Sequence, residues 1–556
     1  MRTSVKKVVR AVVDRPRHSL LVAAAAAISL AAGTTITSAA WTDDEWASGA
    51  VGVGSPGDCT TNTLFTSQSW ARQLSGSVLN TRLDSIAGVE GLTVTNDGTT
   101  ASPVPAAATP VPGTTDAFIS KLPVTVLGGT AVEAGVGLDA PVGGIGSYTQ
   151  WAQAKGSGQA KGASGLVSDQ SGALDVGGTA SGAATAPKAA SISLGRLVPV
   201  SLAGVTLDVG AVASSATLNG CALTNGWPTL DPTPAVERDF GIASLDLNAQ
   251  VPAVEAVAPS VNAALNGIPV TLKDVESNLI QSLTSGVENV LDSLGLVTAA
   301  TTAKLTGLNL ESVRDLLQKP QSEGAVTVTM NTGEVRVDLA KLPGGGSISK
   351  DLPPNSQVVL TAENIAQVEK GVDLLVRRIT AQVRAALDAV TLDATVKADV
   401  RVPLTGLTLG STEITITGTL GQFRTGTAQP PVIRTLGLDL TSLVASLKTA
   451  VVATVADTVV APTNAIISSL QTTLDPLTAT ARSAVGSVLT TVGSLVAIHV
   501  NVQPDQPWSG TRPGDVTAAA GEYKVSAVRV GLVGNAGLLS LSLGNSSAGP
   551  VALRVP

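Results

Sequence analysis

The amino-acid sequence predicts an α+β protein, with a β-rich N-terminal region, then amphipathic helices alternating with β-hairpins, and β-strands at the end. Three observations support this fold class. Stretches rich in Gly, Ser, Thr and Val, broken by turns, fill the first part of the chain. Apolar residues three or four apart then indicate helices, and runs of alternating polarity indicate strands between and after them. Helix pairs packed on sheets or on each other would bury these stripes.

The first 40 residues have the layout of a secretory signal peptide, with a basic start followed by the apolar run Leu20–Ala32. Small residues at Ser38 and Ala40 predict cleavage near Ala40, before Trp41. The apolar run is shorter than the roughly 20 residues that span a bilayer, which favours export over a retained anchor. We therefore expect a secreted or cell-surface protein with no membrane span after cleavage.

The remaining chain is too long for one simple core, and its composition changes along its length. We predict four segments: 1–40, the signal peptide; 41–230, the β-rich region; 231–430, the mixed helix and hairpin region; and 431–556, a helical segment followed by C-terminal strands.

Within the β-rich region, turns are expected at Asn96–Gly98 and at Asn219–Gly220. The prolines between 101 and 113 indicate an exposed connection. From Ala152 to Gly162 small residues alternate with polar ones, which predicts a strand packed closely against another layer. A flexible Ala/Gly linker is the alternative for this run.

Three helical zones follow. The first has apolar residues at Val275, Leu279, Leu283, Val287, Val290 and Leu294, with Gly295 as its stop. The second has them at Ile365, Val368, Val372, Leu375, Ile379, Val383, Leu387 and Val390. Thr361 and Asn364 are expected to cap its start. The third zone covers about Leu443 to Val492, and we expect Pro462 and Asp475-Pro476 to break it.

Strands are expected between and after these helices. The predicted strands are Ala325–Met330 and Glu334–Leu339, which flank the hairpin turn Asn331–Gly333, then Val396–Leu409, Thr412–Phe423, Lys524–Leu532 and Leu539–Leu543.

Charge and composition exclude some functions. Removing residues 1–40, which hold six basic and one acidic residue, changes the net charge from −7 to −12. An acidic chain of this kind is not expected to bind nucleic acid, because such binding depends on Lys and Arg that neutralise phosphates. Aromatic residues make up only 2% of the chain, so the core is expected to consist of Val, Leu, Ile and Ala.

Histidine and cysteine limit the chemistry further. His499 is the one histidine after residue 40, and it lies in the predicted strand Leu495–Val502, where a surface position is expected. One histidine cannot build a multi-His metal site, and a Ser-His-acid triad would have to use it. Cys59 and Cys221 are the only cysteines, and in an exported chain they predict one disulfide. Two buried thiols are the alternative.

No motif predicts catalysis or cofactor binding. Gly52–Gly57 matches GxGxxG, but no strand precedes it and Pro56 gives no sign of the helix that a dinucleotide site requires. The three consecutive carboxylates Asp43, Asp44 and Glu45 are interpreted as a solvated start of chain rather than a calcium site. We therefore predict no catalytic residues, no metal and no cofactor.

Several short stretches together resemble one known family. They are Trp41–Trp46, Cys59 with Ser69–Ala71, Asp239–Leu247, Gly324–Val326 with Gly333–Leu339 and Leu352–Ser356, and Leu541–Pro550. In combination they resemble the choice-of-anchor G family of actinobacterial surface proteins. This resemblance implies a surface protein and transfers no catalytic residues. Some members carry a C-terminal sortase signal, whereas this chain ends at Pro556 without LPxTG. We expect the protein to be released or held non-covalently, unless the sequence stops short of its anchor.

The leading functional hypothesis is an exported, non-enzymatic cell-surface or extracellular matrix protein with a presentation, adhesion or structural role. Its partner would be an unidentified cell-envelope or host component. A second hypothesis is a self-assembling matrix subunit that pairs through the acidic N-terminal stretch or an exposed edge strand. A third is a secreted hydrolase that acts on envelope polysaccharide or esters, with two carboxylates brought together from distant positions.

Overall fold

The computed structural model describes residues 57–78, 81–83, 90–123, 147–176, 190–194, 204–292, 296–342, 352–401, 405, 407–436, 443–508, 512–533 and 539–554. From Gly57 to Pro556 the chain forms one compact unit. The predicted signal peptide, the carboxylates Asp43–Glu45 and all of the Gly52–Gly57 motif except Gly57 lie outside the described residues.

The described residues are predominantly β, with 42% of them in strands and 34% in helices. The predicted α+β balance is therefore wrong, because four antiparallel sheets form the framework of the described residues. The pattern of large apolar residues underestimated the strands. Long strands rich in Ser, Gly and Ala lack the alternation of large and polar side chains on which the prediction depended.

The largest sheet, sheet A, has the first and last long strands of the chain at its centre. Its strands are β1 (Phe65–Val78), β2 (Thr81–Arg82), β3 (Leu92–Asn96), β4 (Ala101–Val104), β18 (Ser356–Val358), β22 (Val496–Val502), β23 (Tyr523–Leu532) and β24 (Leu539–Leu553). They follow the order β18-β22-β23-β24-β1-β3-β4, and β2 pairs with β1. Strands β1 and β24 are antiparallel and pair from Phe65 opposite Leu553 to Val78 opposite Leu539.

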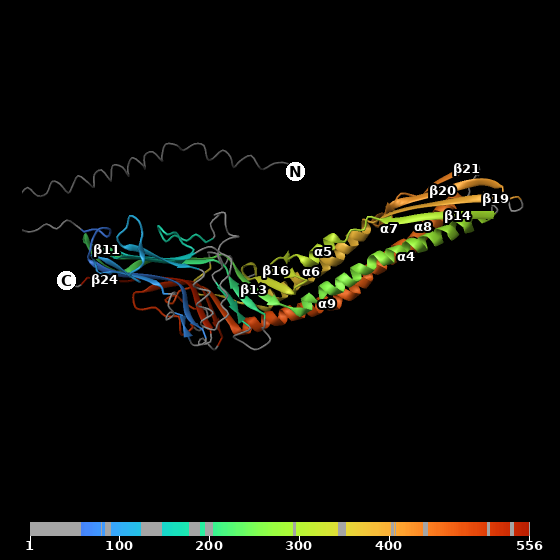
Figure 1. The fold of residues 1–556 in the computed structure, drawn as a ribbon. Coiled ribbons are helices and arrows are strands. Elements are labelled where there is room, and N and C mark those ends of the chain that lie inside the picture. Colours follow the sequence, from blue (N-terminus) through green and yellow to red (C-terminus); the bar gives the residue numbers. More distant parts are fainter. Residues whose placement is uncertain are drawn as a thin grey trace, which may run out of the picture. The chain divides into compact units, whose positions relative to one another are not determined.

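Sheet B packs against sheet A. Its strands are β5 (Thr109–Pro110), β6 (Ala117–Pro123), β7 (Ser147–Ala154), β8 (Gln159–Gly165), β11 (Val212–Thr224) and β12 (Trp227–Ile242). They follow the order β12-β11-β8-β7-β6-β5. Strands β8 and β11 contact β24 of sheet A, and Figure 1 shows β11 and β24 lying side by side.

The interface between sheets A and B is unusually close and polar. A Cβ atom at Gly162 would lie 2.4 Å from the carbonyl oxygen of Trp70 and 2.5 Å from that of Ser547. Hydroxyls also bond across the interface. Ser69 Oγ donates to the backbone oxygen of Gln153 over 2.9 Å, for example. The close packing predicted for the run from Ala152 to Gly162 is confirmed. The packing between the two sheets depends on Gly, Ala and Ser rather than on Val, Leu and Ile.

Two further sheets complete the β framework of the described residues. Sheet C consists of β9 (Ala190–Ser193), β10 (Thr206–Val209), β13 (Leu245–Gln250), β15 (Gln321–Glu323), β16 (Val326–Thr329) and β17 (Glu334–Asp338). Sheet D consists of β14 (Leu296–Thr306), β19 (Thr391–Arg401), β20 (Thr408–Thr419) and β21 (Val432–Leu436). The orders are β15-β16-β17-β13-β10-β9 and β14-β19-β20-β21. Strands β16 and β17 confirm the predicted hairpin around Asn331–Gly333.

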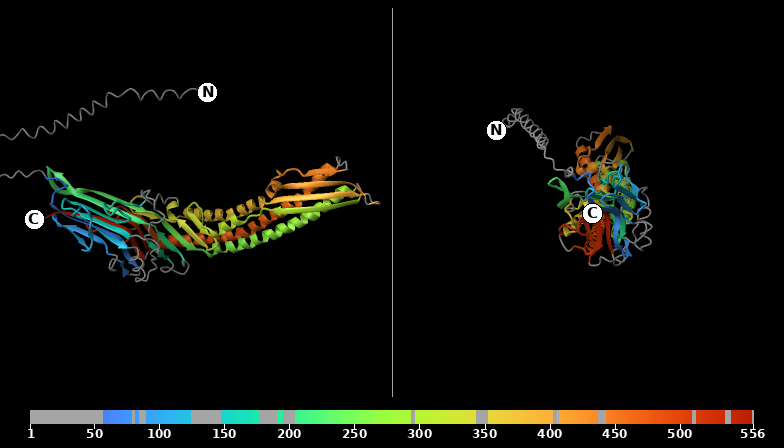
Figure 2. Two further views of the ribbon diagram at one scale, coloured as in Figure 1. Left: turned by 45° about the horizontal axis from the view of Figure 1, so that its top comes forward. Right: turned by 90° about the vertical axis from the view of Figure 1, so that its left-hand side faces the viewer.

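Long helices bury the predicted apolar stripes. The helical elements are α3 (Pro252–Glu255), α4 (Val257–Leu291), α5 (Glu311–Gln318), the 3-10 turn η5 (Leu339–Lys341), α6 (Ala362–Asp388), α7 (Leu420–Thr425), α8 (Val444–Val455), the π-helical turn η6 (Ala456–Val460) and α9 (Ala461–Leu495). Both α4 and α6 contact α9, and the three run beside one another in Figures 1 and 2. Helix α4 also contacts β14 and α8.

Helix boundaries differ from prediction where proline occurs. Helix α6 is confirmed, and the Thr361 side chain accepts a hydrogen bond from the Asn364 backbone at its start. Pro462 and Pro476 do not break the third zone. Pro462 lies two residues after the π-helical turn Ala456–Val460 and Pro476 lies inside α9, yet the helix continues without a break from Val444 to Leu495. Buried residues on both sides of Pro476, such as Leu474, hold the helix together by packing.

Strand limits predicted from the sequence also need correction. The alternating run at 152–162 is not one strand but the antiparallel hairpin of β7 and β8. The predicted strand Thr412–Phe423 extends too far, because Leu420–Thr425 form helix α7 with a capping box at Thr419. The predicted domain boundary at 230 lies inside β12. The prolines of β12 argued against a strand in the sequence. They are tolerated because β12 is an edge strand of sheet B.

Candidate functional site

A polar cavity of about 500 Å³ lies over sheet A, and β1, β2, β22, β23, β24, Pro504 and the segment 515–517 line it. Its size is in the range of small-ligand sites. Hydroxyl groups line much of it: those of Ser75, Ser77, Ser526, Ser540, Ser542 and Thr517. We call this cavity the serine pocket. Arg72, Arg82 and Lys524 add cationic groups to its lining, and Asn545 adds an amide.

One carboxylate, Asp515, lies among the lining residues, and it is already engaged. Arg529, buried in β23, donates from Nη2 to Asp515 Oδ1 over 2.7 Å and from Nε to Oδ2 over 3.2 Å. The Ser540 hydroxyl donates to the same carboxylate. Burial alone would raise the pKa of Asp515, but the bonds from Arg529 and Ser540 outweigh it and hold that pKa below its ordinary value. Asp515 is therefore an ionised structural group.

His499 lies beside this cluster but does not join it in a triad. It pairs with Arg529 across β22 and β23, and its ring centroid lies 5.3 Å from that of Trp508. The predicted surface position is wrong, because the side chain is only 8% exposed. Burial and the nearby Arg529 charge lower the pKa of His499 to about 4, although Asp515 opposes the shift. Ser540 bonds directly to Asp515, so a triad order of serine, histidine and acid is not formed here.

A second set of contacts holds Trp70 at the pocket wall. The Trp70 Nε1 group donates to Glu522 Oε1 over 2.5 Å. Lys524 Nζ lies 3.2 Å from Glu522 Oε2 and 5.2 Å from the centre of the Trp70 ring. These contacts fix an aromatic ring and a cation in one place, which gives the pocket a preorganised wall.

The arrangement is suited to binding a ligand rich in hydroxyl groups. Serine hydroxyls both donate and accept hydrogen bonds, as the hydroxyls of a sugar do. A glycosidase needs two carboxyl groups flanking the bond that breaks. Among the residues lining the serine pocket Asp515 is the one carboxylate, and Arg529 and Ser540 already hold it. The hydroxyl groups of the pocket are therefore suited to hydrogen bonding with a polyhydroxylated ligand.

The disulfide prediction is confirmed. Cys59 and Cys221 are bonded, with their Cα atoms 5.6 Å apart, and they join the segment before β1 to β11. Within the described part of the chain, no group of three His, Cys, Asp or Glu side chains could hold a metal ion. Among the described residues, one continuous helix, Val444–Leu495, is long and apolar enough to cross a membrane by length and composition, with a mean hydropathy of 1.6 over its most apolar 18 residues.

Sequence reasoning missed the serine pocket. Its residues come from positions as distant as Trp70 and Asn545, so no local motif contains them. One signal was present in the sequence: Arg529 interrupts the apolar run of the predicted strand Lys524–Leu532. A buried arginine in a strand requires an acidic or polar partner, and Asp515 meets this requirement.

The fold and the pocket define a class: a β-rich protein in which two closely packed antiparallel sheets carry a hydroxyl-lined cavity. Residues 69–549 match the model of the family described as domain of unknown function DUF8394. Since this match covers most of the chain, the protein belongs to that family. No curated protein and no solved structure matches the chain.

Proposed function

We propose that this protein is an exported, non-enzymatic cell-surface protein with an adhesive role, and that its serine pocket binds carbohydrate of the cell envelope. The signal-like residues 1–40 and the resemblance to the choice-of-anchor G family support export. The Cys59–Cys221 disulfide is compatible with an extracellular location. The acidic chain also suits a solvated extracellular surface.

One observation carries the binding role: a pocket of about 500 Å³ that combines many hydroxyls with a fixed indole ring. Polar groups held in place give specificity for a polyhydroxylated ligand, because little ordering is needed when the ligand arrives.

The direct test measures binding of purified envelope polysaccharides by calorimetry. Ser542→Trp places a large ring in the pocket, and we expect it to weaken binding by at least about tenfold. Ser102→Trp is the matched control, because Ser102 is an exposed residue of β4 outside the pocket. Equal affinity of both variants would contradict the proposal, whereas release of new reducing ends from the polysaccharide would favour the hydrolase alternative.

Export has a separate test. A culture of the source organism is fractionated into medium, membrane and wall, and the mature N-terminus is determined. We expect a start at Trp41 and protein in the medium or on the wall. An intact N-terminus on a cytoplasmic protein would contradict export while leaving the pocket experiment unaffected.

Self-association is a second candidate, and it rests on strand β21. This strand pairs with β20 on one side, and among the described residues no strand pairs with its other side. Val432 is 53% and Leu436 75% exposed, so an apolar edge is available for strand addition. Light scattering over a range of concentrations tests this. A mass that rises in the parent but not in Val432→Lys supports it, and a constant monomer mass contradicts it.

A further inference from the structure

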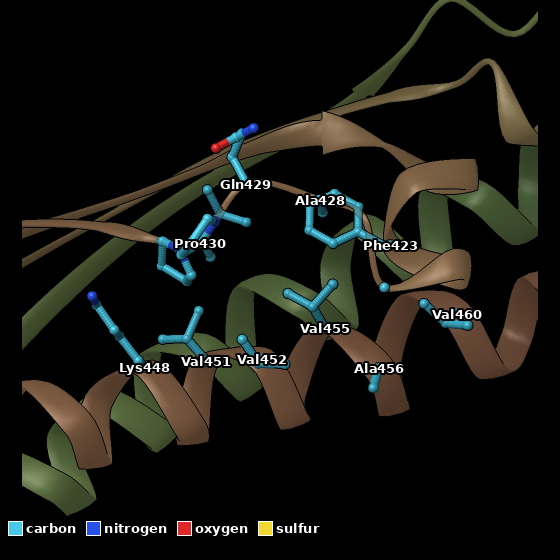
Figure 3. A pocket seen from close by; sticks show the side chains of 13 residues that line it. Phe423, Ala428, Gln429, Pro430, Lys448, Val451, Val452, Val455, Ala456 and Val460 are labelled. Carbon is cyan, nitrogen blue, oxygen red and sulfur yellow. The ribbon is translucent and has the colours of Figure 1, made fainter.

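A second cavity, of about 320 Å³, lies between sheet D and the helix formed by α8 and η6 (Figure 3). Strand β20 contributes Ile416 and helix α7 contributes Phe423. Pro430 and Pro431, just before β21, form another part of the wall. On the helix side the lining runs from Lys448 through three valines to Val460. We call this cavity the valine groove.

The groove is apolar along its length but open to solvent. Of its 13 lining residues, only Gln429 and Lys448 have polar side chains. Its deepest residues are fully buried, such as Val451 at 1% exposure, whereas the adjacent Val452 is 56% exposed. Only 28% of the most apolar part of the helix Val444–Leu495 is buried. An apolar cavity left exposed in this way is a feature of a ligand site rather than of a packed core.

The helix geometry is adapted to the groove. Buried residues recur every four positions from Leu447 to Ile467, and each such step over-rotates an ideal α-helix by about 40°. The π-helical turn Ala456–Val460 adds a residue to one turn and so offsets part of this rotation. Ala456 and Val460 both line the cavity. Turns of this kind occur frequently at functional sites.

Length and charge identify the ligand class. Lys448 and Val460 are twelve residues apart on the helix, or about 18 Å at 1.5 Å per residue. One acyl chain is about half as long as the roughly 30 Å hydrocarbon core of a bilayer, so it matches this length. Figure 3 shows Lys448 at one end of the labelled row of helix residues, with its ammonium group rising toward Pro430.

We propose that the valine groove binds a free long-chain carboxylic acid, with its acyl chain along Val451, Val455 and Val460 and its carboxylate at Lys448. Carbohydrate has no apolar chain for such a groove, so this site is independent of the serine pocket. The cation at one end favours an acid over a neutral lipid, because a charge-assisted bond is stronger than a neutral one.

The first test uses a dansyl-labelled undecanoic acid, whose fluorescence rises in an apolar site, with unlabelled tetradecanoate as competitor. We expect saturable binding to the purified protein without membranes. Val452→Glu places a carboxylate at the open side of the groove and should weaken binding by at least about tenfold. Val270→Glu is the matched control, since Val270 is 63% exposed on α4 and does not line the groove. Circular dichroism verifies that both variants fold.

A second variant tests the carboxylate contact. Lys448→Gln should raise the dissociation constant of tetradecanoate, corrected for the affinity of the label, about tenfold. The dissociation constant of tetradecanol should stay unchanged. Lys273→Gln, on the exposed surface of α4, is its control. The proposal is overturned if the label binds Val452→Glu and the parent equally, or if it binds the protein only in the presence of phosphatidylcholine vesicles. Equal loss of acid and alcohol binding in Lys448→Gln would overturn the assignment of the carboxylate end.

Discussion

The interface between sheets A and B and the interfaces among the long helices exclude water with different residues. Between the sheets, small residues allow the backbones to approach, and hydroxyls bond from one layer to the other, as Ser214 does with Ser546 over 2.8 Å. Among the helices, stripes of Val, Leu and Ile such as Leu279 and Ile379 are fully buried. The first arrangement depends on shape and hydrogen bonding, whereas the second depends on the transfer of apolar surface from water.

This difference predicts different responses to mutation. A close backbone contact has no room for added atoms, and the atoms around it cannot move without breaking the sheets. An apolar stripe instead loses stability in proportion to the surface and volume removed. The four experiments below test the comparison, in order of decreasing expected effect.

The largest effect is expected for Gly162→Val in β8. The new Cβ would lie within 2.5 Å of two backbone oxygens, those of Trp70 and Ser547. Neither oxygen belongs to a flexible side chain, so we expect loss of folding, seen as the absence of a cooperative thermal transition. Gly267→Ala in α4 is the control. Its Cβ would meet nothing within 4 Å, and we expect a gain of about 0.5–1 kcal/mol. A folded Gly162→Val protein would contradict the close contact.

Leu279→Ala tests the helical stripe. Leu279 is fully buried on α4, so the lost transfer free energy and the new cavity should lower the free energy of unfolding by about 3–5 kcal/mol. Urea unfolding followed by circular dichroism measures it. Val270→Ala, at a largely exposed position of the same helix, should change stability by less than about 0.5 kcal/mol. Equal effects at the two positions would mean that the stripe is not the buried face.

Removal of the disulfide tests how much of the stability of the sheets depends on a covalent link. Replacing Cys59 and Cys221 by serine opens a loop of 162 residues, and we expect a loss of about 2–4 kcal/mol. Reduction of the parent should lower its free energy of unfolding, measured with urea, by the same amount. Reduction should leave the stability of the double variant unchanged. Two thiols that react with a maleimide in the denatured, unreduced parent would contradict the bond.

The smallest expected effect is a pH dependence of stability that arises from His499 in sheet A. Burial lowers the pKa of His499 to about 4, below its ordinary value near 6.5, so the unfolded chain binds a proton more readily than the folded one. The stability that neutral, buried His499 contributes is complete above pH 6.5. It should be lost as the pH falls to 4, by up to about 3 kcal/mol. The difference in stability between parent and His499→Gln, measured at each pH, should follow this curve. A constant difference would contradict the shift.

Local signals predicted part of this fold. The stripe of α6, its cap at Thr361 and the β16–β17 hairpin all depend on residues close together in the chain, and each is confirmed. The Cys59–Cys221 bond followed from the number of cysteines and the expected compartment.

Other features depend on contacts between distant residues. Prolines disguised β12, because only the sheet order reveals that this strand is an edge. The burial of His499 depends on Trp508 and on the neighbouring strand β23. The serine pocket joins residues from both ends of the chain, so neither periodicity nor spacing could have located it.

The pairing of β1 with β24 has a consequence for biosynthesis. Phe65 lies opposite Leu553, so the first long strand is made long before its central neighbour exists. At the usual rates of translation this interval lasts on the order of tens of seconds. An unpaired strand of large apolar residues would invite aggregation during that time. Strand β1 instead carries Ser67, Gln68 and Ser69 near its start, and these polar residues make that part of the strand less prone to aggregate before the last residues of the chain arrive.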